Sequence, residues 1–128
     1  MVPSQADQLS ARVRHFAIRI LRFVRTLARD PTTDGIARQI ARSAPSVWAN
    51  YRSSRRARSR AEFIARLGIV ADEAEETEGW LDMLKEAGLA AGQELEWLLN
   101  ESKEIRAIFV QSAATARANQ RAARSSNP

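Results

Sequence analysis

Residues 63–84, FIARLGIVADEAEETEGWLDML, decide the fold because their apolar residues recur at alternating steps of four and three. The recurring positions are Phe63, Leu67, Val70, Ala74, Thr77, Leu81 and Leu84. Side chains with this heptad spacing share one face of an α-helix, and that face packs against other helices. Ser59 and Glu62 have the spacing of a capping box at the start of this helix. Gly88 and Leu89 follow it as a C-terminal cap and its hydrophobic partner.

Three further amphipathic segments surround this helix, and the sequence shows no convincing strand. Apolar residues at helical spacing predict helices over about 8–29, from an N-cap at Asp34 to about residue 51, and over about 91–116. The segment 30–35, DPTTDG, has the composition of a turn. Pro45 lies inside the second segment, where a missing backbone donor predicts a kink or a break.

Four amphipathic helices joined by short turns predict an all-α protein, an antiparallel up-down-up-down four-helix bundle. We assign residues 1–116 to this bundle. Residues 117–128 are mainly Ala, Arg, Ser and Asn and carry no apolar stripe. They are therefore expected to form a frayed or disordered basic tail.

Composition excludes several classes of protein. The 128 residues suit one domain, and a hydrophobic content of 45% is sufficient for a real core. There is no cysteine, so disulfides and thiolate metal sites are excluded. No apolar run approaches the roughly 20 residues that span a bilayer. The first ten residues have neither the charged nor the apolar part of a signal peptide, so we expect a cytoplasmic protein without a membrane role.

Charge is distributed unevenly along the chain, whose net charge is +5. Residues 1–70 hold 14 Arg and four acids, whereas residues 71–105 hold two Lys and 11 acids. The last segment, 106–128, holds four Arg and no acid. Such asymmetry attracts polyanions or pairs one subunit with another.

Neither catalysis nor metal binding is indicated. His15 is the single histidine, and a triad or dyad needs a recognisable motif around it that is missing here. No glycine-rich phosphate loop is present. The acids of 72–78 lie mostly off the apolar seam and lack the Glu-x-x-His spacing of di-iron bundles. We therefore expect a non-enzymatic protein with no catalytic, cofactor-binding or metal residues and no cofactor.

An arginine cluster is the feature that supports a functional hypothesis. Its members, within YRSSRRARSR at 51–60, are Arg52, Arg55, Arg56, Arg58 and Arg60. Guanidinium groups match phosphate oxygens and also stack on bases. The cluster therefore predicts nucleic-acid binding. Ion pairing with the acidic helix of a neighbouring subunit, or plain solvation, are the alternatives.

The chain has three tryptophans, Trp48, Trp80 and Trp97, of which Trp80 and Trp97 lie at the margins of their stripes. Tryptophan in such a position is more often the edge of a core or a subunit contact than a platform for bases. Because tryptophan is enriched in interface hot spots, subunit contact is the preferred interpretation.

Residues 38–84 resemble a known family. The matching runs are Arg-Ser-x-x-Ser-Val-x-Ala-Asn-Tyr-Arg at 42–52, Arg-Ala-Arg-Ser-Arg-Ala-Glu-Phe-Ile at 56–64 and Leu-Gly-Ile-Val at 67–70. Glu-Ala-Gly-Leu at 86–89 and Ala-Ile-Phe-Val at 107–110 extend the resemblance over about 15–116. This pattern is similar to the bacterial four helix bundle protein family. That family includes proteins encoded in intervening sequences of large-subunit ribosomal RNA genes and is related to the accessory variability determinants of diversity-generating retroelements.

The resemblance implies an antiparallel bundle that assembles into a homo-oligomer, with a pentamer favoured. It also implies an accessory protein that binds nucleic acid through basic surface residues, with RNA favoured over DNA, and that has a reverse transcriptase as a possible partner. Our hypothesis is therefore an oligomeric RNA-binding protein. The alternative is a protein–protein interaction scaffold that uses its charge-polarised surface without nucleic acid.

Overall fold

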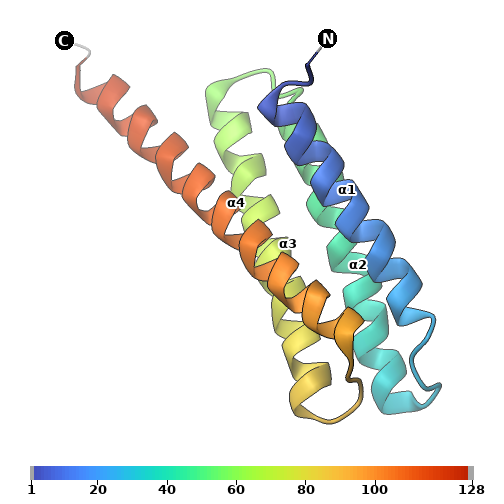
Figure 1. Cartoon of the computed structure of the whole chain (residues 1–128). Coiled ribbons are helices and arrows are strands. Elements are labelled where there is room, and N and C mark those ends of the chain that lie inside the picture. The colour runs from blue at the N-terminus through green and yellow to red at the C-terminus, as the bar shows by residue number, and fades with distance from the viewer. Residues whose placement is uncertain (1, 127–128) are drawn as a thin grey trace.

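The computed structural model describes residues 2–126 and confirms an all-α fold in which four helices alternate in direction (Figure 1). The helices are α1 (Gln5–Val24), α2 (Pro31–Ser54), α3 (Arg60–Glu86) and α4 (Gln93–Ser125). Each helix packs against its neighbour in sequence, and α1 also packs against α4, which closes the bundle. No helix within residues 2–126 is long and apolar enough to cross a membrane.

The predicted seam of α3 forms the centre of the core. Phe63 is half-buried, and every later member of the heptad from Leu67 to Leu84 is buried. Gly88 adopts a φ of 70°, and the amide of Leu89 donates to the carbonyl of Leu84 at 2.9 Å. This arrangement is the left-handed helix cap that the sequence predicts, because glycine alone adopts that φ without steric cost.

The start of α2 differs from the prediction by one helical turn. Asp30, and not Asp34, is the N-cap, because its side chain accepts from the amide of Thr33 at 3.0 Å. Pro31 then occupies the first helical position, where its missing N–H costs nothing. The predicted turn at 30–35 is therefore mostly helix. The first helix ends at Val24 rather than near Arg29, and the hydroxyl of Thr26 donates to the carbonyl of Phe23 at this end.

Two local predictions about α2 and α3 need correction. Of the kink or break expected at Pro45, the break does not occur, since α2 is continuous from Pro31 to Ser54. The capping box at the start of α3 is present, with the amide of Glu62 donating to Ser59 Oγ at 3.1 Å. Its return bond, however, runs to the Glu62 carboxylate from the amide of Arg58, and not from that of Ser59.

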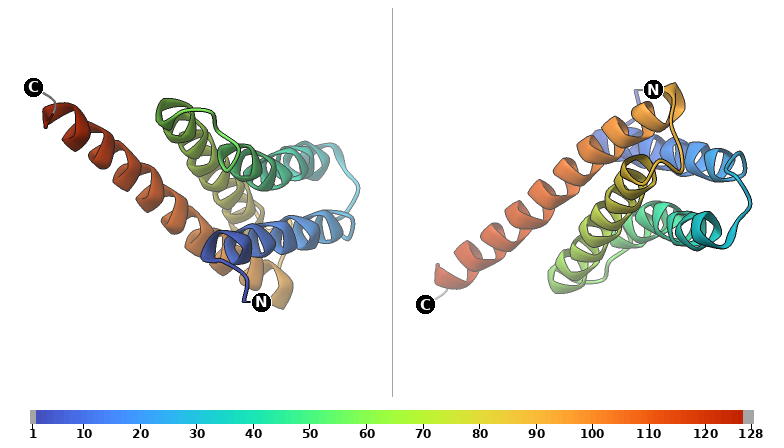
Figure 2. Two further views of the ribbon diagram at one scale, coloured as in Figure 1. Left: turned by 90° about the horizontal axis from the view of Figure 1, so that it is seen from above. Right: turned by 90° about the horizontal axis from the view of Figure 1, so that it is seen from below.

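The last helix is longer than predicted. It continues to Ser125, so the expectation of a frayed or disordered tail is wrong for residues 117–125; residues 127–128 lie outside the described residues. Figures 1 and 2 show this part of α4 leaving the other three helices. Alanine and arginine are strong helix formers, and extending an existing helix avoids the cost of nucleation. Helical structure therefore persists without an apolar stripe.

Candidate nucleic-acid interface

The antiparallel packing of α2 and α3 gathers the arginine cluster at one end of the bundle. Arg52 lies in the last turn of α2, Arg55 is its C-cap and Arg60 begins α3. Arg56 and Arg58 lie in the intervening loop. All five residues are exposed. The structure therefore places all five predicted site residues at the same end of the bundle, although Arg55 is directed to α1 and Arg60 lies beside α4.

Arg55 differs from the other members of the cluster because it forms an ion pair with the first helix. Its Nη2 atom donates to Asp7 Oδ1 at 2.7 Å. This hydrogen bond, followed by one from Ser4, lowers the pKa of Asp7. Arg55 therefore ties the end of α2 to the first turn of α1. The remaining members, which we call the unpaired cluster arginines, have no carboxylate partner within residues 2–126; they are Arg52, Arg56, Arg58 and Arg60.

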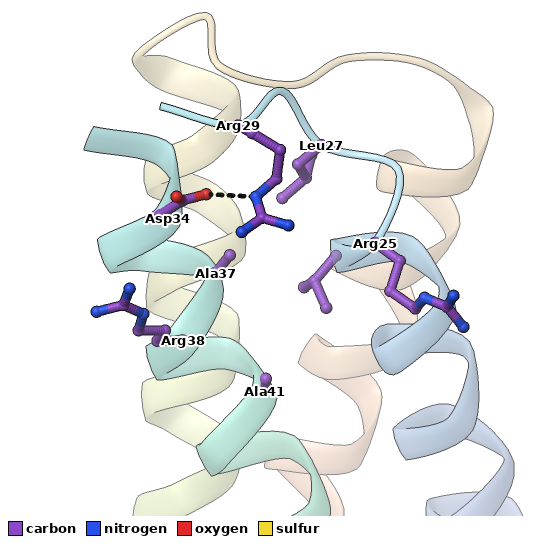
Figure 3. Close-up of a pocket in the computed structure, with 8 residues that line it drawn as sticks. Arg25, Leu27, Arg29, Asp34, Ala37, Arg38 and Ala41 are labelled. Carbon is purple, nitrogen blue, oxygen red and sulfur yellow. Dashed lines mark ion pairs between the residues drawn. The ribbon is translucent and has the colours of Figure 1, made fainter. Parts of the chain in front are cut away.

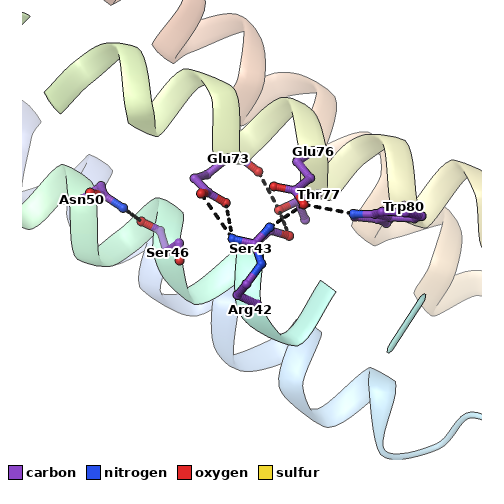
Figure 4. Close-up of polar contacts among 8 residues, drawn as sticks. All are labelled: Arg42, Ser43, Ser46, Asn50, Glu73, Glu76, Thr77 and Trp80. Carbon is purple, nitrogen blue, oxygen red and sulfur yellow. Dashed lines mark hydrogen bonds and ion pairs between the residues drawn. The ribbon is translucent and has the colours of Figure 1, made fainter. Parts of the chain in front are cut away.

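Acidic residues of α3 and α4 pair mainly with basic residues elsewhere in the same chain. Between α2 and α3, Arg42 binds Glu73 at 3.2 Å and also binds Glu76 (Figure 4). Between α3 and α4, Glu78 pairs with Arg106, and Glu96 pairs with Lys85 at 2.8 Å. Arg19 pairs with Glu94 across α1 and α4. Much of the acidic segment is thus neutralised internally, away from the arginine cluster.

A buried hydrogen bond accompanies the ion pairs between α2 and α3. The hydroxyls of Ser43 and Thr77 lie 2.8 Å apart, and Thr77 also donates to the carbonyl of Glu73 (Figure 4). Both residues are fully buried, so an unmatched hydroxyl there would cost stability. The pair fixes the register of the two helices that carry the cluster.

Arg12 joins α1 to α4 through the least exposed of these carboxylates. Its Nε and Nη2 atoms donate to Glu101 at 2.9 and 2.6 Å, and Nη2 also reaches Glu104 at 2.5 Å. The Glu101 side chain is 12% exposed, compared with 67% for Glu104. The hydrogen bond from Arg12 is the main cause that lowers the pKa of Glu101.

We expect Glu101→Gln to reduce the free energy of unfolding by up to about 1 kcal/mol at neutral pH. Folding favours the charged carboxylate, so its contribution is present above the ordinary pKa of 4.5 and is lost as the pH falls below it. The difference between wild type and variant should therefore shrink in acid. Urea unfolding at several pH values measures this. Glu104→Gln is the matched control and should cost less; an equal cost would contradict the role given to burial.

The extension of α4 adds basic residues that sequence reasoning did not assign to the site. Arg117, Arg121 and Arg124 recur at steps of four and three, so they share one helical face. The Nη2 atom of Arg117 lies against Gly68 of α3, 3.1 Å from the position that a Cβ atom would take there. Asn119 and Arg60 line a common hollow. The i, i+4, i+7 spacing of these three arginines was the sequence pattern that could have indicated a basic helical face.

A second basic region, at the opposite end of the bundle, does not form an anion site. A hollow of about 420 Å³ lies between the end of α1 and the start of α2 (Figure 3). Arg29 pairs there with Asp34 at 3.3 Å, while Arg25 and Arg38 point away from the hollow. Their guanidinium groups do not converge on a ligand. Arg25 is the C-cap of α1, at the end of that helix away from Asp7 and the arginine cluster.

The tryptophans and the acidic residues are the other groups considered in the sequence analysis. Trp48, Trp80 and Trp97 are all partly buried and pack against the core, as expected for residues at its edge. Within the described part of the chain, no group of three His, Cys, Asp or Glu residues is placed to hold a metal ion.

Comparison with known proteins places this chain in a family. Residues 8–111 match the family described as 23S rRNA-intervening sequence protein. A similar crystal structure is that of a protein with unknown function from the S23 ribosomal protein family of Bacteroides thetaiotaomicron VPI-5482. It shares 31% sequence identity and a TM-score of 0.77, over 87% of this chain and 99% of that chain. Comparison with curated proteins gives no match. The chain therefore belongs to the 23S rRNA-intervening sequence protein family.

Proposed function

We propose that this protein is a non-enzymatic, oligomeric RNA-binding accessory protein whose arginine cluster contacts phosphates. The observation that carries the proposal is the division of charge. Ion pairs within the chain occupy Arg12, Arg19 and Arg42, whereas the unpaired cluster arginines have no carboxylate partner within residues 2–126. The description of the family, which refers to 23S ribosomal RNA, supports RNA over DNA.

The cluster suits recognition of the backbone rather than of bases in a duplex. Exposed arginines at a helix end reach phosphates and release counterions, which gives affinity without reading sequence. Specificity would then come from RNA shape or from a protein partner. Assembly would multiply the number of clusters that one RNA contacts, so oligomer formation would raise its avidity.

The partners of the protein are part of the same proposal. The family resemblance favours a homo-oligomer, with a pentamer as the favoured form, and a reverse transcriptase as a possible protein partner. A cytoplasmic location is consistent with RNA as the ligand. Each of these points extends the proposal beyond the family assignment.

A second candidate function is a protein–protein interaction scaffold, and a specific observation favours it. Four acids on α3 have no ion-pair partner within residues 2–126, and their spacing places them on one helical stripe. They are Asp72, Glu75, Asp82 and Glu86. This acidic stripe has the charge needed to pair with the arginine cluster of another subunit.

The light-scattering mass of the purified protein, with and without a hairpin RNA, distinguishes the two functions. For the RNA-binding oligomer, we expect a mass above one subunit that rises with RNA at about 50 mM salt. The gain should disappear at about 200 mM salt, because counterion release weakens as salt increases. The RNA-free assembly should keep its mass at both salt concentrations.

Each other result has a defined meaning. An oligomer whose mass does not change with RNA and that dissociates at high salt supports the scaffold, because its contacts would then be ion pairs between subunits. An oligomer whose mass changes neither with RNA nor with salt concentration contradicts both candidate functions. A monomer contradicts the proposed assembly in either function.

A further inference from the structure

The three tryptophans differ in the contacts that each indole ring makes within the protein. The ring of Trp97 lies under Arg19, whose Cζ is 3.5 Å from the centroid, and His15 packs against it edge-on. Trp80 donates its indole N–H to Glu76 at 3.2 Å. Trp48 has neither the hydrogen bond of Trp80 nor the close guanidinium contact of Trp97 within residues 2–126, since Arg52 Cζ lies 5.3 Å from its ring centroid. Trp48 is therefore the indole that the fold leaves most available.

An open hollow of about 320 Å³ adjoins Trp48, on the outer side of α2. Its lining consists of Trp48, Ala49, Arg52, Ser53 and Arg56. We call these residues the Trp48 shelf. Two of them are unpaired cluster arginines, so the shelf is continuous with the proposed phosphate-binding surface.

Arg52 lies over the ring of Trp48 but is not in close contact with it. Its Cζ lies 5.3 Å from the centroid of Trp48, within the range of cation–π attraction but farther than the contact of Arg19 with Trp97. Ala49 contributes only a methyl group, and Ser53 contributes a hydroxyl. A flat aromatic surface with a small side chain, a hydroxyl and two guanidinium groups has the chemistry of a site for one base and its phosphate.

We propose that the Trp48 shelf stacks the base of an unpaired nucleotide while Arg52 and Arg56 hold its flanking phosphates. The inference rests on the proposed RNA-binding function and deepens it. Bases inside a duplex are already stacked and cannot reach the shelf, whereas bases in loops or single strands can. The protein therefore prefers RNA segments with unpaired bases to a perfect duplex.

The test compares single-stranded oligouridine of about ten nucleotides with a blunt RNA duplex of similar length, by fluorescence anisotropy of the labelled RNA. We expect Trp48→Ala to weaken binding of the single strand about tenfold, the effect of losing one stacked base. Duplex binding should change less than twofold, because the arginines remain. Trp48→Phe should retain most of the affinity, since a phenyl ring also stacks.

Two further variants separate stacking from folding. Ala49→Leu fills the hollow at an exposed position and leaves Trp48 in place, so it should also weaken single-strand binding several-fold. Trp80→Phe is the matched control on another helix and should leave both affinities unchanged. Circular dichroism and light-scattering mass without RNA establish that each variant keeps its helices and its assembly.

Several outcomes would overturn the inference. Equal losses for single strand and duplex, together with a lower mass of Trp48→Ala, would place Trp48 in a contact between copies of the chain. Unchanged single-strand binding by both Trp48→Ala and Ala49→Leu would contradict the proposed base site at the Trp48 shelf, without contradicting phosphate binding by the arginines. Absence of RNA binding by the wild-type protein would overturn the proposed function itself, and the shelf with it.

Discussion

Replacing all four unpaired cluster arginines with glutamine should weaken RNA binding about a hundredfold at low salt. Each of these side chains is exposed and none has a carboxylate partner within residues 2–126, so each is available to a phosphate. Glutamine keeps a long polar side chain and good helix propensity, so the fold should be unaffected. The slope of log affinity against log salt concentration should fall by about three, since four phosphate contacts disappear. Titrations at several salt concentrations measure both effects.

A control variant removes the same charge from other exposed positions. Arginines on α1 and near the start of α2 that also lack an ion-pair partner within residues 2–126 provide it; they are Arg14, Arg22, Arg25 and Arg38. Their replacement with glutamine should weaken binding only a few-fold, through the loss of net charge. Equal losses in the two variants would show that overall charge, and not the cluster, holds the RNA. Retained binding in the cluster variant would contradict the proposed site.

Periodicity predicted the helices because it directly records which side chains are buried. The heptad of α3 is the clearest case, since Leu67, Val70 and Leu81 lie in the core as their spacing requires. The cap at Gly88 was also predictable, because its position after the last apolar residue and its permissive φ agree. These features depend on neighbours within a few residues, so a single sequence contains them.

Helix ends were less predictable because competing local signals lie close together. Asp30 and Asp34 both have N-cap chemistry, and Pro31 favours the earlier one. The continuation of α4 past Ala116 depends on helix propensity alone, which an apolar pattern does not report.

The location of the candidate site was predictable, whereas the state of its members was not. The arginine cluster is visible as a sequence run, and the helix order places it at one end of the bundle. Whether a given arginine is available depends on contacts between distant segments, such as that of Arg55 with Asp7, 48 residues apart. The same holds for Trp48 and Trp97, because only the structure shows that Arg19 lies closer to the ring of Trp97 than Arg52 lies to the ring of Trp48.

Phe109→Ala should have the largest effect on stability. Its side chain is fully buried on α4, and its ring packs edge-to-face against Tyr51 of α2, with centroids 5.0 Å apart. Truncating a buried phenylalanine typically costs about 3–5 kcal/mol, through lost burial and the cavity that remains. Since domains are stabilised by only about 5–15 kcal/mol, the variant should be largely or partly unfolded at 37 °C. Urea unfolding at several protein concentrations measures the loss and separates it from assembly.

The neighbouring residue supplies the control, because Val110 lies on the same helix and is 47% exposed. Val110→Ala should change the free energy of unfolding by less than about 0.5 kcal/mol. Phe109→Leu, which keeps most of the volume, should fall between the two variants. Because Tyr51 directly precedes Arg52, loosening this contact should also disturb the end of α2 that carries the arginine cluster. A Phe109→Ala protein as stable as the Val110→Ala protein would contradict the buried contact of Phe109 with Tyr51.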